Sequence, residues 1–198
     1  IEPSLDLRVV TFAGGQVAIG TGDGRFGFFN PTNASVASWT NVLGGAAVTS
    51  IEYNGTNEYL VLGEGGLAQR VNADGSANGQ AVQLPSTRSP TAAWFVNDRW
   101  LIAIGEIGFV LFRGADLSAL RTVDSLLGGD DVLAAEATDA GVLAVGRNGK
   151  MRMTDPTGQP MGSVVTSSLG VDLYDVAFNG TVFLVVGEGG FAQMVDTN

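Results

Sequence analysis

A glycine turn that recurs at a nearly constant interval constrains the fold of this chain more than any other feature. Two of the turns open nearly identical segments, GEGGLAQRV at 63–71 and GEGGFAQMV at 187–195. A fixed period of roughly 20–50 residues is typical of repeat architectures, in which each repeat forms one similar unit. The last glycines of the turns are successively 42, 42, 41 and 41 residues apart, and they are Gly24, Gly66, Gly108, Gly149 and Gly190.

Each glycine turn follows a short apolar run that predicts a β-strand. The runs are too short for helices, and their Val and Ile residues favour strands. They do not alternate with polar residues, which predicts that both faces of each strand are buried. The runs occupy residues 16–19, 59–62, 101–104, 142–145 and 183–186.

Further turns frame each run and divide every repeat into four strands. Asn-Gly pairs at 54–55 and 179–180 precede two of the runs, and we expect type I′ hairpins there, with positive φ at both residues. A third strand follows each glycine turn, as at 67–71, and a more polar fourth strand follows that, as at 81–84. Four short antiparallel strands per repeat, with no helical pattern, are typical of a β-propeller blade.

The sequence thus predicts an all-β fold, a five-bladed β-propeller with four antiparallel strands per blade, in one domain covering residues 1–198. The last repeat stops after its third strand. We expect residues 1–4 to supply the missing fourth strand, so that the N-terminal segment completes the last blade and closes the ring.

The composition excludes several classes of function. A net charge of −10, with a single lysine, argues against nucleic-acid binding, which needs a clustered basic surface. The chain has no cysteine and no histidine, which excludes disulfides, thiol nucleophiles and imidazole bases. No apolar run approaches the length of about 20 residues needed to span a membrane, so no membrane insertion is expected. No cofactor is expected. Carboxylates could still hold Ca²⁺ or Mg²⁺, and Ca²⁺ is the metal that we consider for the candidate site below.

Three aspartates occupy one position in the repeat, eighteen residues before the last glycine of the turn. Carboxylates converging from different blades at the mouth of a central channel would bind Ca²⁺ or an amine, or act as acid and base. The alternative is that each aspartate only satisfies a backbone N–H at the start of a strand. These candidates are Asp6, Asp131 and Asp172, with Asp130 beside them; Val48 and Pro90 take this position in the other repeats.

A second candidate site is formed by the tips of the glycine turns. Acidic residues recur there, and an acidic ring would attract a cation or a basic partner. The alternative is that these charges only keep exposed turns soluble. The candidates are Glu64, Glu106 and Glu188, with Asp23 in the first repeat after allowing for one extra residue; Arg147 takes the position in the fourth.

The order of apolar strand, G-x-G-G turn, short strand and Asp-Gly turn resembles the repeats of bacterial secreted propellers. These include the sialidase-type Asp-box (BNR) propellers and the photosystem II assembly-factor-like propellers, and the nearest match to an Asp-box is NADG at 72–75. The resemblance implies a propeller fold and export. The chain opens at Ile1 rather than Met, so we expect that an upstream segment was either removed as a signal peptide or left out of the sequence; the first alternative predicts a secreted or periplasmic protein.

The loops between the predicted strands are short, and no acid, base and nucleophile stand together in the sequence. We therefore expect a monomeric, non-catalytic scaffold that displays its loops to a protein partner. The alternatives are a lectin-like propeller that binds a glycan and a glycoside hydrolase that uses Asp6, Asp131 and Asp172. Trp39, on the predicted fourth strand of the first repeat, is the aromatic residue that we expect to be exposed.

Overall fold

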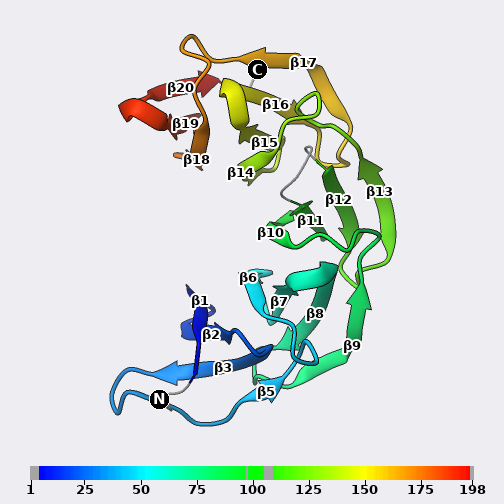
Figure 1. The fold of residues 1–198 in the computed structure, drawn as a ribbon, viewed down its shortest axis with the longest axis vertical. Helices are drawn as coiled ribbons and strands as arrows, with labels where there is room; N and C mark the ends of the chain where they lie inside the picture. The colour runs from blue at the N-terminus through cyan, green and yellow to red at the C-terminus, as the bar shows by residue number, and fades with distance from the viewer. Residues whose placement is uncertain (1–4, 97, 105–108, 197–198) are drawn as a thin grey trace. The chain divides into compact units, whose positions relative to one another are not determined.

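The computed structural model describes residues 5–96, 98–104 and 109–196. These residues form antiparallel β-sheets joined by short turns (Figure 1). The chain divides into two compact units, Ile1–Phe95 and Val96–Asn198, and each is described by itself. Nowhere in the described ranges does a helix have the length and apolarity needed to cross a bilayer.

The first unit contains two complete sheets. One has the order β1–β2–β3–β4, with β5 also pairing to β3, and the other has the order β6–β7–β8–β9. The strands are β1 (Leu7–Ala13), β2 (Gln16–Thr21), β3 (Arg25–Asn30), β4 (Ser35–Val36), β5 (Thr40–Asn41), β6 (Val48–Tyr53), β7 (Glu58–Gly63), β8 (Leu67–Asn72) and β9 (Ala77–Gln83). A further strand, β10 (Pro90–Val96), contains the boundary between the units and belongs to the sheet β10–β11–β12–β13.

The second unit continues the same pattern. After the sheet that ends in β13 come a four-stranded sheet, β14–β15–β16–β17, and a three-stranded one, β18–β19–β20. The strands are β11 (Arg99–Ile104), β12 (Phe109–Gly114), β13 (Ala119–Val123), β14 (Val132–Thr138), β15 (Gly141–Gly146), β16 (Lys150–Thr154), β17 (Pro160–Thr166), β18 (Leu173–Phe178), β19 (Val182–Gly187) and β20 (Ala192–Asp196). Single 3₁₀ turns replace the expected simple hairpins at η1 (Glu64–Gly66), η2 (Arg147–Gly149) and η3 (Glu188–Gly190).

The predicted all-β fold is confirmed, and each apolar run forms the second strand of a sheet built from consecutive strands. The prediction that these strands are buried on both faces holds for β7 and β15, which are buried throughout. It is wrong for β19, where Leu184 is 46% and Val186 37% exposed. One face of β19 packs on the preceding sheet, whereas Leu184 and Val186 lie on its other face.

The fourth strands depart from the prediction in the first and last sheets. In the first sheet the strand is split into β4 and β5, and Trp39 lies in the break between them. Trp39 is half-buried, with the Arg25 guanidinium 5.8 Å from its ring centroid, so the prediction of an exposed Trp39 is wrong. The last sheet ends at β20. Residues 1–4, which we expected to complete it, lie outside the described residues.

The two Asn-Gly hairpins are not type I′ turns. Only the glycines, Gly55 and Gly180, have positive φ there. Each asparagine instead uses its side chain as a cap: Asn54 Oδ1 accepts the N–H groups of residues 56–58, and Asn179 Oδ1 accepts those of residues 181–182. The loops are therefore stabilised by Asx-type hydrogen bonds, which the dipeptide alone does not distinguish from a two-residue turn.

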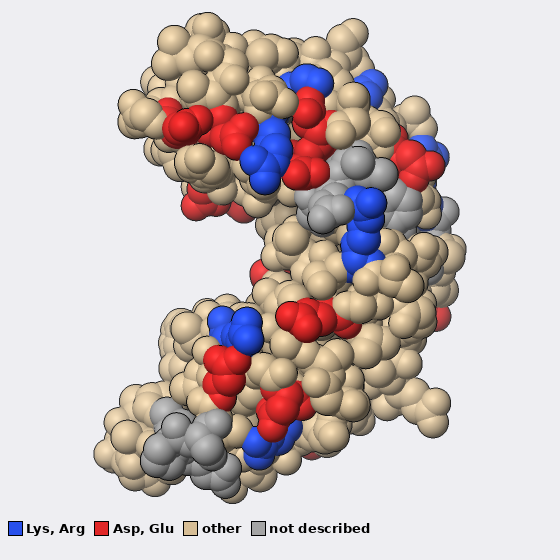
Figure 2. Space-filling model, viewed as in Figure 1, with Lys and Arg blue, Asp and Glu red and all other residues tan. Residues whose placement is uncertain are grey.

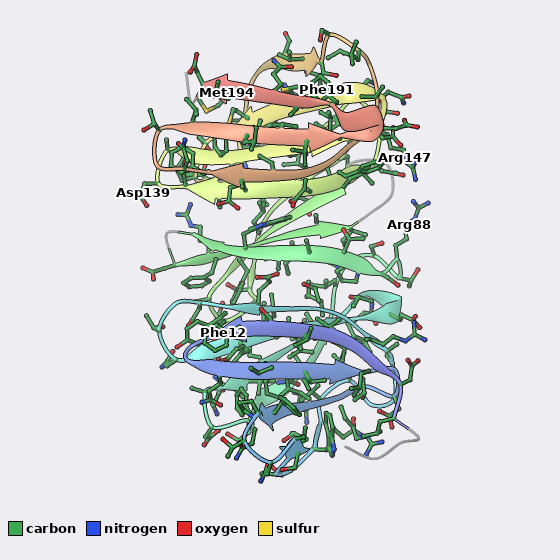
Figure 3. The ribbon with its side chains drawn as sticks, turned by 90° about the vertical axis from the view of Figure 1, so that its left-hand side faces the viewer. Phe12, Arg88, Asp139, Arg147, Phe191 and Met194 are labelled. Carbon is green, nitrogen blue, oxygen red and sulfur yellow. The ribbon has the colours of Figure 1, made fainter. Side chains whose placement is uncertain are left out.

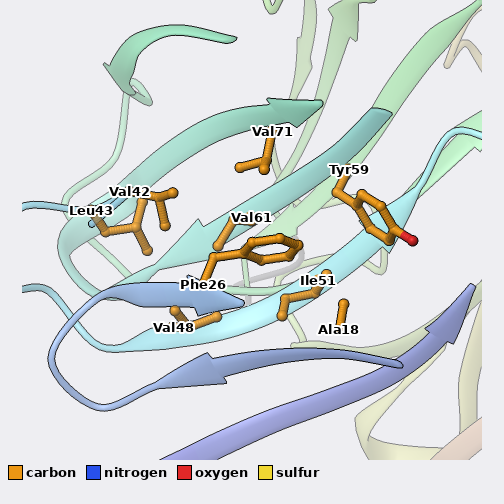
Figure 4. Close-up of a cluster of buried hydrophobic side chains, with 9 residues drawn as sticks. All are labelled: Ala18, Phe26, Val42, Leu43, Val48, Ile51, Tyr59, Val61 and Val71. Carbon is orange, nitrogen blue, oxygen red and sulfur yellow. The ribbon is translucent and has the colours of Figure 1, made fainter. Parts of the chain in front are cut away.

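Apolar side chains fill the space between successive sheets within each unit. In the first unit the cluster in Figure 4 joins Phe26 of β3 to Tyr59 and Val61 of β7, with the two rings 5.6 Å apart. The Tyr59 hydroxyl also donates to the carbonyl of Ala13, 2.7 Å away. In the second unit Phe183 and Val185 of β19 pack in the same way against the sheet that contains β15. The repeat thus creates one sheet-to-sheet contact that recurs along the chain.

Candidate binding site at the glycine turns

One backbone hydrogen bond ties the glycine turn to the start of the innermost strand in four of the sheets. In each, an N–H in the turn donates to the carbonyl of the residue just before that strand, over distances of 2.7 to 3.2 Å. The pairs are Gly22 with Asp6, Glu64 with Ala47, Arg147 with Asp131, and Glu188 with Asp172. Because this bond is the same in every case, it defines which residues are equivalent.

This equivalence corrects two of the sequence assignments by one residue. Ala47, not Val48, takes the position of Asp6, Asp131 and Asp172, since Val48 pairs with Gly63 as Leu7 pairs with Thr21. Gly22, not Asp23, takes the position of Glu64 and Glu188. The count shifted because Thr21 occupies the place of Gly63, so the first turn has no extra residue.

In the second unit, the turn after β15 gathers the predicted aspartates around one arginine. Arg147 Nε lies 2.8 Å from Asp131 Oδ2, and Arg147 Nη1 lies 3.2 Å from Asp172 Oδ2. The hydrogen bond with Asp131, followed by the charge of Asp172, raises the pKa of Arg147 above its usual value. Figure 3 shows Arg147 at the outer end of its sheet, and its side chain is 52% exposed.

Asn148, which the sequence analysis missed, completes this cluster. Its backbone N–H donates to Asp172 Oδ1 at 2.9 Å, and its side-chain amide donates to Asp130 Oδ1 at 3.0 Å. Lys150 forms an ion pair with Asp130 and holds the pKa of that carboxyl below its usual value. The available signal was the position of Asn148 in the turn, because Asn148 has a φ of 55° where the equivalent residues of η1 and η3 are glycines.

The remaining candidates lie apart from this cluster or outside the described residues. Asp6 belongs to the first unit, where its carboxylate pairs with Arg8 Nε at 2.6 Å. Asp23 pairs with Arg25, which together with the Thr21 hydroxyl lowers the pKa of Asp23 to about 2. Glu64 and Glu188 are exposed turn tips without an ion pair to any described residue. Glu106 lies outside the described residues.

The cluster that the structure assembles is a network of alternating charges. Asp130, Asp131 and Asp172 face the two cations of Arg147 and Lys150, so most of the negative charge is balanced locally. On the face drawn in Figure 2, acidic side chains likewise lie beside basic ones. Within the described ranges no three carboxylates stand close enough together to hold a metal ion. Such a network suits polar recognition of another macromolecule.

Comparison with known proteins gives a fold but no family. No family model matches the chain, and no curated protein is similar to it in sequence. The computationally designed Ika8 protein has a TM-score of 0.74 at 15% identity, over 96% of this chain and 58% of its own. BBS1N in complex with ARL6DN, from a crystal soaked with lead, has a TM-score of 0.73 at 12% identity, over 100% and 65% of the two chains. The same complex soaked with mercury has a TM-score of 0.72 at 13% identity, over 98% and 61%.

These neighbours establish an all-β fold like that of the propeller-like domain BBS1N. The chain spans 58–65% of the length of the solved chains that it matches. Because the identities are so low, the likeness concerns the fold alone. The resemblance to Asp-box propellers has no family match and stays a prediction.

Proposed function

We propose that this chain is a non-catalytic binding protein of the β-propeller class, in which five sheets act as blades and present short charged turns to a protein partner. The recurrence of one sheet along the sequence and the propeller-like neighbour support the blade assignment. That neighbour, BBS1N, was itself crystallised in complex with another protein, ARL6DN.

The observation that carries this proposal is the pairing of the candidate carboxylates. Asp131 and Asp172 share Arg147, while Asp130 is held by Lys150 and Asn148. A glycoside hydrolase needs one carboxyl group with a raised pKa beside a second, ionised one. Here the pKa of Asp130 is lowered, chiefly by Lys150, and the other two carboxylates are both paired with Arg147. An exposed network of this kind supports recognition of a charged surface rather than proton transfer.

A charge reversal at the centre of the network tests the proposal. The immobilised chain is used to isolate a partner, and its affinity is then measured with the purified partner by surface plasmon resonance. We expect Arg147→Glu to weaken binding at least tenfold, because it removes both ion pairs and places a fourth negative charge among the three aspartates of the network. Arg121→Glu changes the net charge equally but lies on β13, outside the network, so it serves as the matched control.

Two other results would contradict the proposal. One is saturable binding to a glycan array that depends on the same turn residues, which would indicate a lectin. The other is release of product from chromogenic glycosides that is abolished by Asp131→Asn or Asp172→Asn, which would indicate a hydrolase. A protein partner whose affinity ignores Arg147→Glu would remove the network from the binding surface.

A further inference from the structure

The near-identical segments that open the sequence analysis lie in different surroundings in their two sheets. Residues 67–71 form most of β8, which pairs with β7 on one side and with the fourth strand β9 on the other. Residues 191–195 lead into and form β20, which pairs with β19 alone within the part of the chain that the structure describes. Nearly the same strand sequence is thus paired with a fourth strand in the second sheet and forms an edge strand in the last one.

A glutamine at one position of these segments forms hydrogen bonds to the fourth strand where that strand is present. Gln69 of β8 is 2% exposed. Its side-chain amide donates to the Arg70 carbonyl of its own strand at 2.7 Å and to the carbonyls of Asn78 and Gly79 in β9 at 3.2 and 3.5 Å. Gln193 of β20 is the equivalent residue, since it pairs with Val185 as Gln69 pairs with Val61. Gln193 is exposed, and no acceptor for its amide lies among the described residues.

The side-chain amide of Gln69 faces a bulge in the strand that it contacts. Residues 79–81 stand opposite Gln69 in a break of the ladder, where Gly79 has a φ of 79°. The β16–β17 pair repeats this arrangement. Residues 162–164 stand opposite Arg152, Gly162 has a φ of 62°, and its carbonyl accepts the Arg152 Nη2 donor at 2.7 Å. A side-chain donor facing a bulged glycine carbonyl is therefore a recurring device between third and fourth strands.

An apolar groove lies beside the open edge of β20. Its volume is about 420 Å³, and exposed side chains of β17 line it, with Met161 48% and Val165 56% exposed. Gln193 and Val195 line it from the side of β20. Arg152, a further lining residue, has a buried Nε atom without a hydrogen-bond partner. Methionine-lined surfaces adapt readily to the side chains that enter them.

We propose that β20 binds an extended segment of a separate polypeptide partner, which adds to the last sheet as its fourth strand and fills this groove. The site takes a strand with small β-branched or apolar residues at alternate positions and a glycine bulge whose carbonyl accepts the Gln193 amide. The segment is uncharged or basic, because Asp196 lies at the groove and the chain carries a net charge of −10. This inference rests on the proposed protein-binding function and names a second surface for it.

Residues 1–4 of the same chain are a poorer occupant than a separate segment. Their sequence, Ile-Glu-Pro-Ser, has no glycine to form the bulge, and Pro3 has no N–H to donate to a ladder. Glu2 would also bring a further negative charge toward Asp196.

The chain itself supplies a probe for this site. A fluorescein-labelled peptide with the sequence of residues 76–84, SANGQAVQL, is the fourth strand that the equivalent glutamine already recognises in the second repeat. We expect saturable binding in fluorescence anisotropy, with new hydrogen-exchange protection confined to β20 and its neighbours. Gln193→Leu should weaken binding about three- to tenfold, the value of one hydrogen bond. Replacing the peptide glycine by alanine should weaken it about fivefold, because positive φ is costly for alanine.

Two controls separate the proposed contact from general stickiness. Gln80→Leu removes an exposed glutamine from β9, away from the groove, and should leave the affinity unchanged. Val165→Glu places a charge in the groove and should abolish peptide binding while the far-ultraviolet circular dichroism stays the same. The Arg147→Glu variant should bind the peptide normally. This control distinguishes failure of the peptide site at β20 from failure of the proposed binding surface at the glycine turns.

Three results would overturn this inference. The first is the absence of saturable binding up to millimolar peptide. The second is binding that neither Gln193→Leu nor the glycine replacement weakens. The third is protection of the β20 amides in the free protein as strong as that of β16, because a segment of the chain itself would then occupy the edge.

Discussion

Asn148 occupies a turn position that is glycine in the equivalent turns after β7 and β19. Its φ of 55° lies in the left-handed region, which asparagine tolerates better than other residues with a side chain. We expect Asn148→Ala to lower the free energy of unfolding by roughly 1–2 kcal/mol, through backbone strain and the lost hydrogen bond to Asp130. Asn148→Gly keeps the backbone free of strain and should cost less than Asn148→Ala. Urea denaturation of the two variants checks this, and equal losses would place the effect in the side-chain bond alone.

Glu136 of β14 is the described carboxylic acid whose pKa is raised by burial, with the charge of Asp175 adding to the effect. Since its pKa in the folded state exceeds 4.5, protonation stabilises the fold, and this stabilisation is fully present below pH 4.5 and lost as pH rises through the folded pKa. We therefore expect Glu136→Gln to be more stable than the parent at pH 7.5, with the difference shrinking as the pH falls toward 4.5.

Thermal unfolding at a series of pH values measures this difference. Asp139→Asn is the control, because it removes one negative charge from an exposed hairpin, labelled in Figure 3, rather than from a buried site. A Glu136→Gln variant with the same pH dependence as the parent would show that burial does not control this group.

At the scale of strands, one position of the repeat is buried or exposed according to the sheet that follows it. Leu143 of β15 and Leu184 of β19 are equivalent, since they pair with Met153 and Met194, yet their exposures are 1% and 46%. We expect Leu143→Ala to lower the free energy of unfolding by about 2–5 kcal/mol, as for a filled core position. Leu184→Ala should cost less than about 1 kcal/mol. Chemical denaturation of the matched pair checks this, and equal losses would mean that a further element covers β19 in solution.

The sequence predicted those strands that are defined by an apolar run and an adjacent glycine, because both signals lie within a few residues of each other. Residues 142–145 and 183–186 need no knowledge of their neighbours to be read as strands. The register was less accessible, because the hairpin between β6 and β7 is one residue longer than its equivalent between β1 and β2. Val48 pairs with Gly63, 15 positions on, whereas Leu7 pairs with Thr21, 14 positions on, so Ala47 rather than Val48 is equivalent to the aspartates. The pairing depends on which backbone groups meet across two strands, and a count along one chain does not contain that information.

For the candidate site too, the sequence predicted some of the residues that lie together but not the contacts between their side chains. The spacing identified Asp131 and Asp172 as partners, and the structure does place both against one turn. The role of Asn148 and the capture of Asp6 by Arg8 depend on side-chain geometry across or beside a turn.

At the scale of the whole molecule, a strong negative charge coexists with exposed apolar side chains. The net charge is −10, while Val10, Phe12 and Met194 are 68%, 75% and 72% exposed. Charge repulsion keeps copies apart at neutral pH and low salt, and it weakens near the pI of about 4.2 or in high salt. We expect self-association to rise under both conditions and to fall in the double variant Phe12→Ser/Met194→Ser. Light scattering at pH 7.5 and pH 4.2, with low and high sodium chloride, measures it.

Two other outcomes of the light-scattering experiment would place the contact between copies elsewhere. If the double variant associates as strongly as the parent, the contact lies on other exposed residues, such as Leu169, which is 67% exposed. Association that increases at neutral pH when salt is removed would instead indicate attraction between opposite charges on different copies.

The bond between each glycine turn and the residue before its innermost strand uses only backbone atoms. This bond therefore makes no use of the side chain at that residue, which is aspartate in three sheets and alanine in the second. A substitution at any of these positions leaves the backbone bond in place. A chain built in this way can acquire new side chains at the rim of one sheet at a time, while the backbone contact that holds the turn is kept.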